Sequence, residues 1–406
     1  MSEVIERALA KPSIFKDESK LSIDYVPENL PHREDELETL TSYFRFMIEK
    51  PGGLCQKVLI VGPVGTGKTA TSKLFGKVFS NLAEKKGVKL KYFHVNCHKD
   101  RTLYMVLKRV IKGLMPNFPE RGLSAQEMLQ AIWDYLESED SYALLTLDEL
   151  DYFIRTAGET ALYDLIRMSD ELLNLPQRFS FIFIARSQVF LPALDKSTRS
   201  TLMHNIIRFK PYTASQLKDI LKARVEEAFF EGAISDEIIS IIADIASETG
   251  DARYALELLW RAAKYAEVEE SRRVKLEHVR KAASDMHPFM RVEVLENLLL
   301  HEKILLLAIA RTLKTADTAY VTMGEIEETY KLICEELNER PRKHTQLWEY
   351  VQNLKNLGLI KANVTNVKRK GRSTKIGLVE VPIETIEKEV LALIWREKSG
   401  RAKQHT

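Results

Sequence analysis

Short apolar runs alternate with amphipathic segments through about the first 210 residues of the chain. The runs are rich in Val, Ile, Leu and Phe, as strands buried on both faces are, and the segments between them have apolar residues at helical spacing. The predicted strands are 58–61, 89–95, 142–149, 178–187 and 206–209. Strands that alternate with helices predict a parallel sheet covered on both sides, in one α/β domain over residues 21–210.

The next part of the chain shows only helical periodicity. Between residues 211 and 290 the apolar positions predict an all-helical domain. Ser235 is a suitable N-cap for one of its helices. Gly250 is suited to end that helix, and another begins near Asp251.

The third region, residues 291–395, predicts three helices and then two strands. The helices are expected at 292–313, 322–337 and 342–357, and the strands at 360–367 and 374–381. This order is typical of a winged helix-turn-helix domain. Residues 1–20 and 396–406 are polar, and we predict a flexible arm and a tail there.

Composition excludes several classes of protein. The 406 residues are 45% hydrophobic and 29% charged, as in ordinary globular proteins. No apolar run approaches the length of a membrane span and the start lacks a signal-peptide core, so we expect no membrane partner. Cys55, Cys97 and Cys334 have neither metal-ligand nor disulfide spacing, which indicates a reducing, cytoplasmic environment.

A glycine-rich turn, GPVGTGKT at residues 62–69, directly follows the first predicted strand and precedes an amphipathic helix. That is the context of a phosphate-binding loop, in which backbone N–H groups and the helix N-terminus bind phosphate oxygens. Lys68 is expected on the β- and γ-phosphates, and the Thr69 hydroxyl on Mg²⁺. We therefore predict ATP or ADP binding with Mg²⁺. The predicted loop contacts are Gly62, Gly65, Thr66, Gly67, Lys68, Thr69 and Ala70.

The third predicted strand ends in two carboxylates, Asp148 and Glu149. Downstream of a phosphate loop, the first is expected to hold Mg²⁺ together with Thr69. The second is expected to orient the attacking water. For two carboxylates taken alone, a solvated strand end is the alternative interpretation.

Basic residues are concentrated near the predicted wing. Residues 340–376 hold ten Lys and Arg and one acidic residue, a local charge of +9 in a chain of net charge +2. A basic island indicates a polyanionic partner, here double-stranded DNA. The third helix is expected to read bases and the hairpin to contact phosphates. The predicted contacts are Arg342, Lys343, His344, Thr345, Gln346, Lys368, Arg369, Lys370 and Arg372. A wing that docks protein is the alternative.

The order of ATPase core, helical lid and winged helix resembles the AAA+ replication initiators. Within these, the chain is similar to the archaeal origin recognition and cell-division-control proteins, from about residue 22 to about 382. The segments that carry the resemblance are VPENLPHRE (26–34), GPVGTGKT (62–69), LLTLDELD (144–151), RFKPYTASQLKDILKAR (208–224) and GDARYALELL (250–259).

The resemblance implies further contacts to the nucleotide, at the adenine and from the start of the lid. The residues concerned are Val26, Pro27, Arg33, Tyr212 and Arg224. From its position alone, Arg253 is better interpreted as a solvated arginine on a helix. The resemblance instead implies that it reaches the γ-phosphate as sensor 2. The insertion around 97–123, which includes Arg101, is implied to touch DNA.

Two positions depart from the family pattern. Ser187 stands at the sensor-1 position, where Asn is usual. Ser197 stands where the arginine finger is expected, and Arg199 follows two residues later. These departures bear on whether a neighbouring subunit can activate ATP hydrolysis in this chain.

The resemblance predicts an ATP-binding initiator that recognises chromosomal origin DNA, alone or beside paralogous initiators, and helps recruit the replicative minichromosome maintenance helicase. Slow ATP hydrolysis would act as its switch. Two alternatives stay open: a DNA-binding module with permanently bound ADP and negligible hydrolysis, and a signalling NTPase whose winged helix docks protein.

Overall fold

The computed structural model describes the chain except for 1–5, 7–12, 120–121, 168–175, 287–294, 296–297, 317, 358, 368–370, 379–382 and 405–406. The described residues form two compact units. One comprises Asp24–Ile220 and Thr249–Arg253, and the other Met1–Ile23, Leu221–Glu248 and Tyr254–Thr406. No described helix is long and apolar enough to cross a bilayer.

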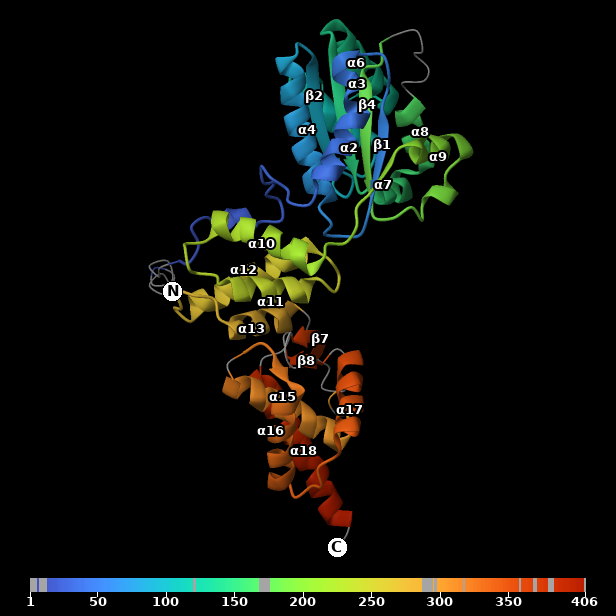
Figure 1. The fold of residues 1–406 in the computed structure, drawn as a ribbon. Helices are drawn as coiled ribbons and strands as arrows, with labels where there is room; N and C mark the ends of the chain where they lie inside the picture. Colours follow the sequence, from blue (N-terminus) through green and yellow to red (C-terminus); the bar gives the residue numbers. More distant parts are fainter. Residues whose placement is uncertain are drawn as a thin grey trace. The chain divides into compact units, whose positions relative to one another are not determined.

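The first unit contains a five-stranded parallel sheet in the order β2-β3-β4-β1-β5 (Figure 1). This confirms the predicted parallel α/β fold. Its strands are β1 Lys57–Val61, β2 Lys89–Asn96, β3 Ser141–Asp148, β4 Phe179–Ala185 and β5 Ile206–Arg208.

Alternate side chains of the central strands enter two different cores. Val58 and Ile60 of β1 pack on the side of α2 and α4, whereas Leu59 and Val61 pack on the side of α5 and α6. The helices of this unit are α2 Glu34–Phe44, α3 Phe46–Glu49, α4 Lys68–Lys85, α5 Leu103–Leu114, α6 Ala125–Ser138, α7 Leu150–Ala157, α8 Glu159–Arg167 and α9 Lys196–His204. A single-turn 3₁₀ helix, η2, covers Leu191–Ala193.

The lid consists of α10 Ala214–Ala228, α11 Asp236–Ala246, α12 Ala252–Val268 and α13 Leu276–Met286. The Ser235 hydroxyl accepts a hydrogen bond from the Ile238 N–H at 3.3 Å, as the predicted N-cap requires. Gly250 has a φ of +65°, and a Cβ there would lie 2.5 Å from the Cβ of Pro211. Both facts explain a glycine in the turn before α12.

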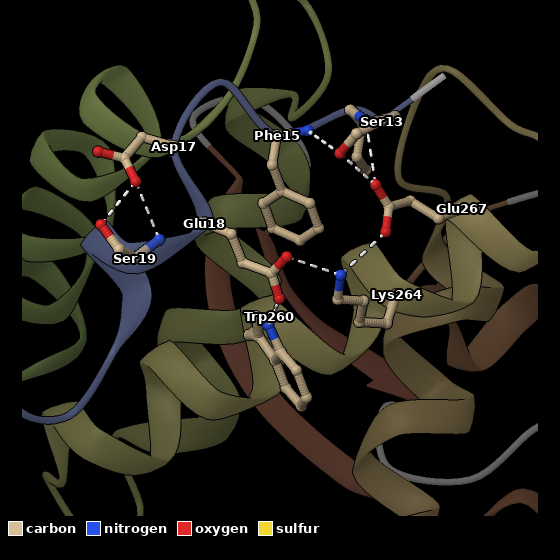
Figure 2. Close-up of polar contacts among 9 residues, drawn as sticks. Ser13, Phe15, Asp17, Glu18, Ser19, Trp260, Lys264 and Glu267 are labelled. Atoms are coloured by element: carbon tan, nitrogen blue, oxygen red, sulfur yellow. Dashed lines mark hydrogen bonds and ion pairs between the residues drawn. The ribbon is translucent and has the colours of Figure 1, made fainter. Parts of the chain in front are cut away.

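Part of the predicted arm packs on the lid instead of extending freely. Residues 13–21, which we call the strap, include the 3₁₀ helix η1 Glu18–Leu21 and pair with the end of α10 through a Phe15–Phe229 bridge. The side chains of Ile14, Phe15 and Leu21 are buried. Figure 2 shows strap residues meeting Trp260, Lys264 and Glu267 of α12.

The winged-helix domain is confirmed. It contains α15 Leu300–Ala316, β6 Val321–Thr322, α16 Met323–Glu336, α17 His344–Asn356, β7 Lys361–Val367, β8 Gly371–Gly377 and α18 Ile383–Gln404, with an antiparallel sheet in the order β6-β8-β7. The helix α18 was not predicted and runs through much of the expected tail. It joins the core because Ile386, Val390 and Ile394 are fully buried there.

Candidate functional site

The glycine-rich turn links the end of β1 to the start of α4. Gly65 and Gly67 have φ angles of +73° and +87°, in the left-handed region that favours glycine. A Cβ on Gly65 would lie 1.7 Å from Oδ1 of Asp251, and one on Gly67 would lie 2.6 Å from the Tyr212 hydroxyl. Both the conformation and the close neighbours therefore require glycine at these two positions.

Lys68 is the first residue of α4 and its ammonium lies over the loop. Its Nζ donates to the carbonyl oxygens of Gly62 and Pro63, each at 2.6 Å. Burial lowers the pKa of Lys68 to about 8, against the opposing effect of Asp148. Arg253 and Arg186 lower it further, so both guanidinium groups lie within electrostatic range of this ammonium.

The hydroxyl of Thr69 meets the carboxylate at the end of β3. Its Oγ1 donates to Oδ2 of Asp148 at 2.7 Å, and Nε2 of His94 lies 3.4 Å from the same oxygen. Burial raises the pKa of Asp148, but hydrogen bonds from His94 and Thr69 outweigh it and the pKa lies below its usual value. A hydroxyl and an ionised carboxylate so close together fit the oxygen ligands of Mg²⁺.

Glu149 caps α7 with a left-handed φ of +64°. Its Oε2 accepts from Nε and Nη2 of Arg186 at 3.2 and 3.0 Å, and Nε2 of His98 lies 3.5 Å from it. The His98 ring stacks on Tyr152, with centroids 3.8 Å apart. Neither Arg186 nor His98 was predicted at this site, because their approach to Glu149 follows only from β2, β3 and β4 ending at one edge of the sheet.

Arg33 is buried beside the loop. Its guanidinium donates to the carbonyl oxygens of Thr66 at 3.0 Å and Lys210 at 3.1 Å, and lies 3.9 Å from the ring centroid of Tyr212. Burial raises the pKa of Tyr212. Two residues that the resemblance implied at the nucleotide are thus next to the phosphate loop. Their contacts to a nucleotide stay predictions.

The segment before α12 also reaches the loop. The N–H of Ala252 donates to the carbonyl oxygen of Gly65 at 3.1 Å, and Asp251 accepts from the N–H of Arg253 at 2.7 Å. Arg253 is therefore in the first turn of a helix whose start is hydrogen-bonded to the loop. Contact of the Arg253 guanidinium with the γ-phosphate stays a prediction.

The remaining predicted nucleotide residues are less closely connected to the loop. Pro27 is buried and Val26 half-buried, and the exposed Ser187 accepts a 3.4 Å hydrogen bond from the N–H of Val189. Arg224 belongs to the other compact unit, where it pairs with Glu227 at 3.5 Å. Their roles at the nucleotide stay predictions.

The predicted DNA-reading residues are at the start of α17. Arg342, Lys343, His344, Thr345 and Gln346 are all exposed, whereas Leu347, Val351 and Leu354 bury the opposite face. Lys343 is the N-cap, so the helix begins two residues later than predicted.

Two contacts hold the start of α17 in place. The Tyr330 hydroxyl accepts from the N–H of Arg342 at 3.3 Å and lies 2.7 Å from Nδ1 of His301. His344 pairs with Glu327, an acidic neighbour that the sequence analysis missed.

The other predicted DNA contacts are placed less fully. Lys368, Arg369 and Lys370 lie outside the described residues, and Arg372 is described only as part of β8. Arg101 is exposed, and its Nε donates to the carbonyl oxygen of His98 at 3.1 Å. Contact of these residues with DNA stays a prediction.

Models of three protein families match successive parts of the chain. An AAA domain matches residues 54–191, the Cdc6 AAA+ ATPase-type lid domain matches 218–284, and the CDC6 C-terminal winged helix domain matches 293–389. Together they follow the core, lid and winged helix of the structure.

Curated and solved proteins agree with these matches. The ORC1-type DNA replication protein 2 of Sulfurisphaera tokodaii is 40% identical over 94% of this chain and 93% of its own. The Cdc6p crystal structure from Pyrobaculum aerophilum has a TM-score of 0.84 and 33% identity, covering 95% and 100% of the two chains. The Aeropyrum pernix ORC1 structure in complex with DNA has a TM-score of 0.61 and 31% identity, covering 94% and 97%. The chain therefore belongs to the ORC1/Cdc6 family of AAA+ replication initiator ATPases.

Proposed function

We propose that this initiator binds ATP at the phosphate loop and recognises double-stranded origin DNA through its winged helix. The observation that carries the proposal is the meeting of Lys68, Thr69 and Asp148 at one edge of the sheet, in a chain of this family. The exposed start of α17 and the DNA-bound ORC1 relative support the second half. Recruitment of the minichromosome maintenance helicase, and cooperation with paralogous initiators, are part of the same proposal.

The residues around the loop have distinct tasks in nucleotide binding. N–H groups of the loop and the start of α4 bind phosphate oxygens, and Lys68 adds a full positive charge. Thr69 and Asp148 would hold Mg²⁺, which when bound neutralises charge on the β- and γ-phosphate oxygens. Arg253 senses the γ-phosphate. Since its helix belongs to the lid, ATP and ADP are expected to favour different lid positions.

Hydrolysis is proposed to depend on Glu149. Its carboxylate orients the attacking water and accepts a proton from it. In the structure this carboxylate is engaged by Arg186 and approached by His98. An engaged carboxylate is less available to a water, which gives a physical reason for slow turnover.

The test of DNA recognition is footprinting on genomic DNA with ATP, with ADP and without nucleotide. We expect protection at a small number of discrete sites. The pattern should differ between ATP and ADP, because ADP lacks the γ-phosphate that Arg253 of the lid is proposed to sense. Uniform, weak protection along all DNA would argue against origin recognition. Identical footprints in all three conditions would argue against a nucleotide switch.

Substituting Arg186 is expected to raise the rate of hydrolysis. Exposed ion pairs are worth up to ~1 kcal/mol, so Arg186→Ala should increase kcat by about fivefold and leave KM nearly unchanged. Single-turnover release of phosphate measures the effect. Arg155→Ala is the matched control, since it removes a cation from α7 without touching the Glu149 pair.

Two further variants separate this role of Arg186 from others. Arg186→Lys should keep most of the restraint, and Glu149→Gln should bind ATP without cleaving it. Adding Arg186→Ala to Glu149→Gln should then give no acceleration. A slower Arg186→Ala enzyme with weakened ATP binding would instead make this arginine a phosphate ligand.

The second candidate function is a DNA-binding module with permanently bound ADP. The engagement of Glu149 by Arg186, together with a serine at position 187, favours it. No release of phosphate over hours from wild type and Arg186→Ala, with and without DNA, would support this candidate.

A further inference from the structure

The strap is held on the lid by a continuous set of contacts. The N–H groups of Lys16 and Asp17 donate to the carbonyl oxygen of Ala228 at 2.8 and 3.1 Å, and the N–H of Phe230 donates to the carbonyl oxygen of Ile14 at 3.2 Å. The ring of Phe15 packs 4.8 Å from that of Phe229 and is 6% exposed. The strap is therefore packed on the lid as part of its structure.

Charged side chains fasten the strap to α12. Oε1 of Glu18 accepts from Nε1 of Trp260 at 2.6 Å, and its Oε2 accepts from Nζ of Lys264 at 2.8 Å (Figure 2). The same ammonium lies 4.7 Å from the centroid of the Phe15 ring. Partial burial raises the pKa of Glu18, but the hydrogen bonds from Lys264 and Trp260 outweigh it and the pKa is lowered. Glu18 is thus a carboxylate held between two donors of one helix.

The strap shares α12 with the proposed sensor-2 arginine. At 100° per residue, Trp260, Lys264 and Glu267 lie within about 40° of Arg253 around the helix axis. Arg253 is in the first turn of the helix and Glu267 in its last, so one stripe of α12 has a γ-phosphate sensor at one end and strap contacts further along. Because a helix is stiff over this length, a shift of one end moves the other.

The strap also leads directly to the segment that the family resemblance places at the adenine. Only five peptide steps separate Leu21 of the strap from Val26, a distance of at most ~18 Å. Pro27 is buried, and the Arg33 guanidinium is hydrogen-bonded to the carbonyl oxygen of Thr66 in the phosphate loop. A bound nucleotide would then be linked to both sides of the contact between the strap and α12. It would be linked to the strap through the segment at the adenine, and to α12 through Arg253 at the γ-phosphate.

We propose that residues 13–21 act as a nucleotide-sensitive clamp, which docks on α10 and α12 and slows the release of adenine nucleotide. The proposal rests on the proposed nucleotide site at the phosphate loop. If nucleotide strengthens docking by a given factor, docking strengthens nucleotide binding by the same factor, since the two equilibria are linked. Loss of the strap contacts is therefore expected to weaken nucleotide binding from a distance.

The test uses trypsin cleavage at Lys16 and Lys20, which lie in the strap, together with fluorescent ADP binding to the full chain. In the wild type, ADP should slow cleavage at these lysines by about tenfold, within the usual coupling range of ~5- to 150-fold. Phe15→Ala should be cut rapidly with or without ADP and should bind ADP about tenfold more weakly, with faster release. Ile23→Ala, which truncates an exposed apolar residue just after the strap, should match the wild type.

A milder variant guards against unfolding of the lid. Glu18→Gln keeps Phe15 in place and removes the charge that meets Lys264, so it should give smaller changes of the same sign in both measurements. Rapid cleavage of Phe15→Ala with unchanged ADP affinity would overturn the clamp and leave a strap that only covers the lid. ADP binding to wild type without slower cleavage would overturn it too. A wild type that binds no ADP would refute the nucleotide site itself, while the Phe15→Ala comparison would still report whether the strap docks.

Discussion

Lys68→Ala is expected to weaken ATP binding by about 100-fold, the factor that corresponds to a charge-assisted contact of up to ~3 kcal/mol. The substitution removes the ammonium that lies over the carbonyl oxygens of Gly62 and Pro63. The loss should be smaller for ADP, which lacks the γ-phosphate. Equilibrium titration with fluorescent nucleotides measures both affinities. Lys77→Ala, an exposed lysine on the same helix, is the matched control, and wild-type affinity in Lys68→Ala would defeat the assignment of the loop.

The same lysine predicts how binding depends on pH. Its pKa of about 8 means that Lys68 is charged at pH 7 and mostly neutral at pH 9. A bound phosphate favours the charged form, so binding above pH 8 must take up a proton, and the dissociation constant should rise about tenfold from pH 7 to pH 9. Lys68→Arg should show a flatter profile, because arginine stays protonated over this range.

The phosphate loop was predictable because its chemistry is local. A buried strand, two glycines at left-handed positions and a following helix are all adjacent in the sequence, so Gly65, Gly67 and Lys68 could be assigned without a structure. Thr69 and Asp148 were predicted to share one Mg²⁺ ion, because an apolar strand that ends in carboxylates follows the phosphate loop, and in the structure the two side chains are hydrogen-bonded to each other. Local pattern therefore sufficed where neighbours in space are also neighbours in sequence, or follow from strand order.

Contacts between distant segments were not predictable in the same way. Arg186 and His98 meet Glu149 only because three strands end together, and neither residue belongs to a recognisable motif. The strap was predicted as a polar arm because its buried residues, Ile14, Phe15 and Leu21, are few and lie among polar and charged neighbours. The helix α18 was not predicted because its C-terminal part is strongly charged and was therefore interpreted as a polar tail. In each case the sequence did not reveal the part of the same chain against which the segment packs.

DNA affinity is expected to fall steeply with salt. A protein that neutralises about six phosphates loses ~10³-fold in affinity between 50 and 200 mM salt. Binding releases the counterions of these phosphates, and this release becomes less favourable as the salt concentration rises. Fluorescence anisotropy with labelled duplexes at several salt concentrations measures the slope. A winged helix that docks protein predicts no such dependence, so a flat profile would favour the signalling alternative.

Substitutions should separate the sequence-independent contribution to DNA affinity, from phosphate contacts, from the sequence-specific contribution of base contacts. Reversing the charge of Lys368, Arg369 and Lys370 together should weaken binding to every duplex alike and reduce the salt slope by about one per lost phosphate contact. Lys388→Glu, an exposed charge reversal on α18, should change neither. Gln346→Ala should instead alter the preference among sequences by ~1–3 kcal/mol at one base pair and leave the salt slope intact, because an amide reads a base edge without releasing a counterion. Wild-type binding by the triple variant would make the basic hairpin a solvated loop, and would leave the start of α17 as the surface that meets DNA.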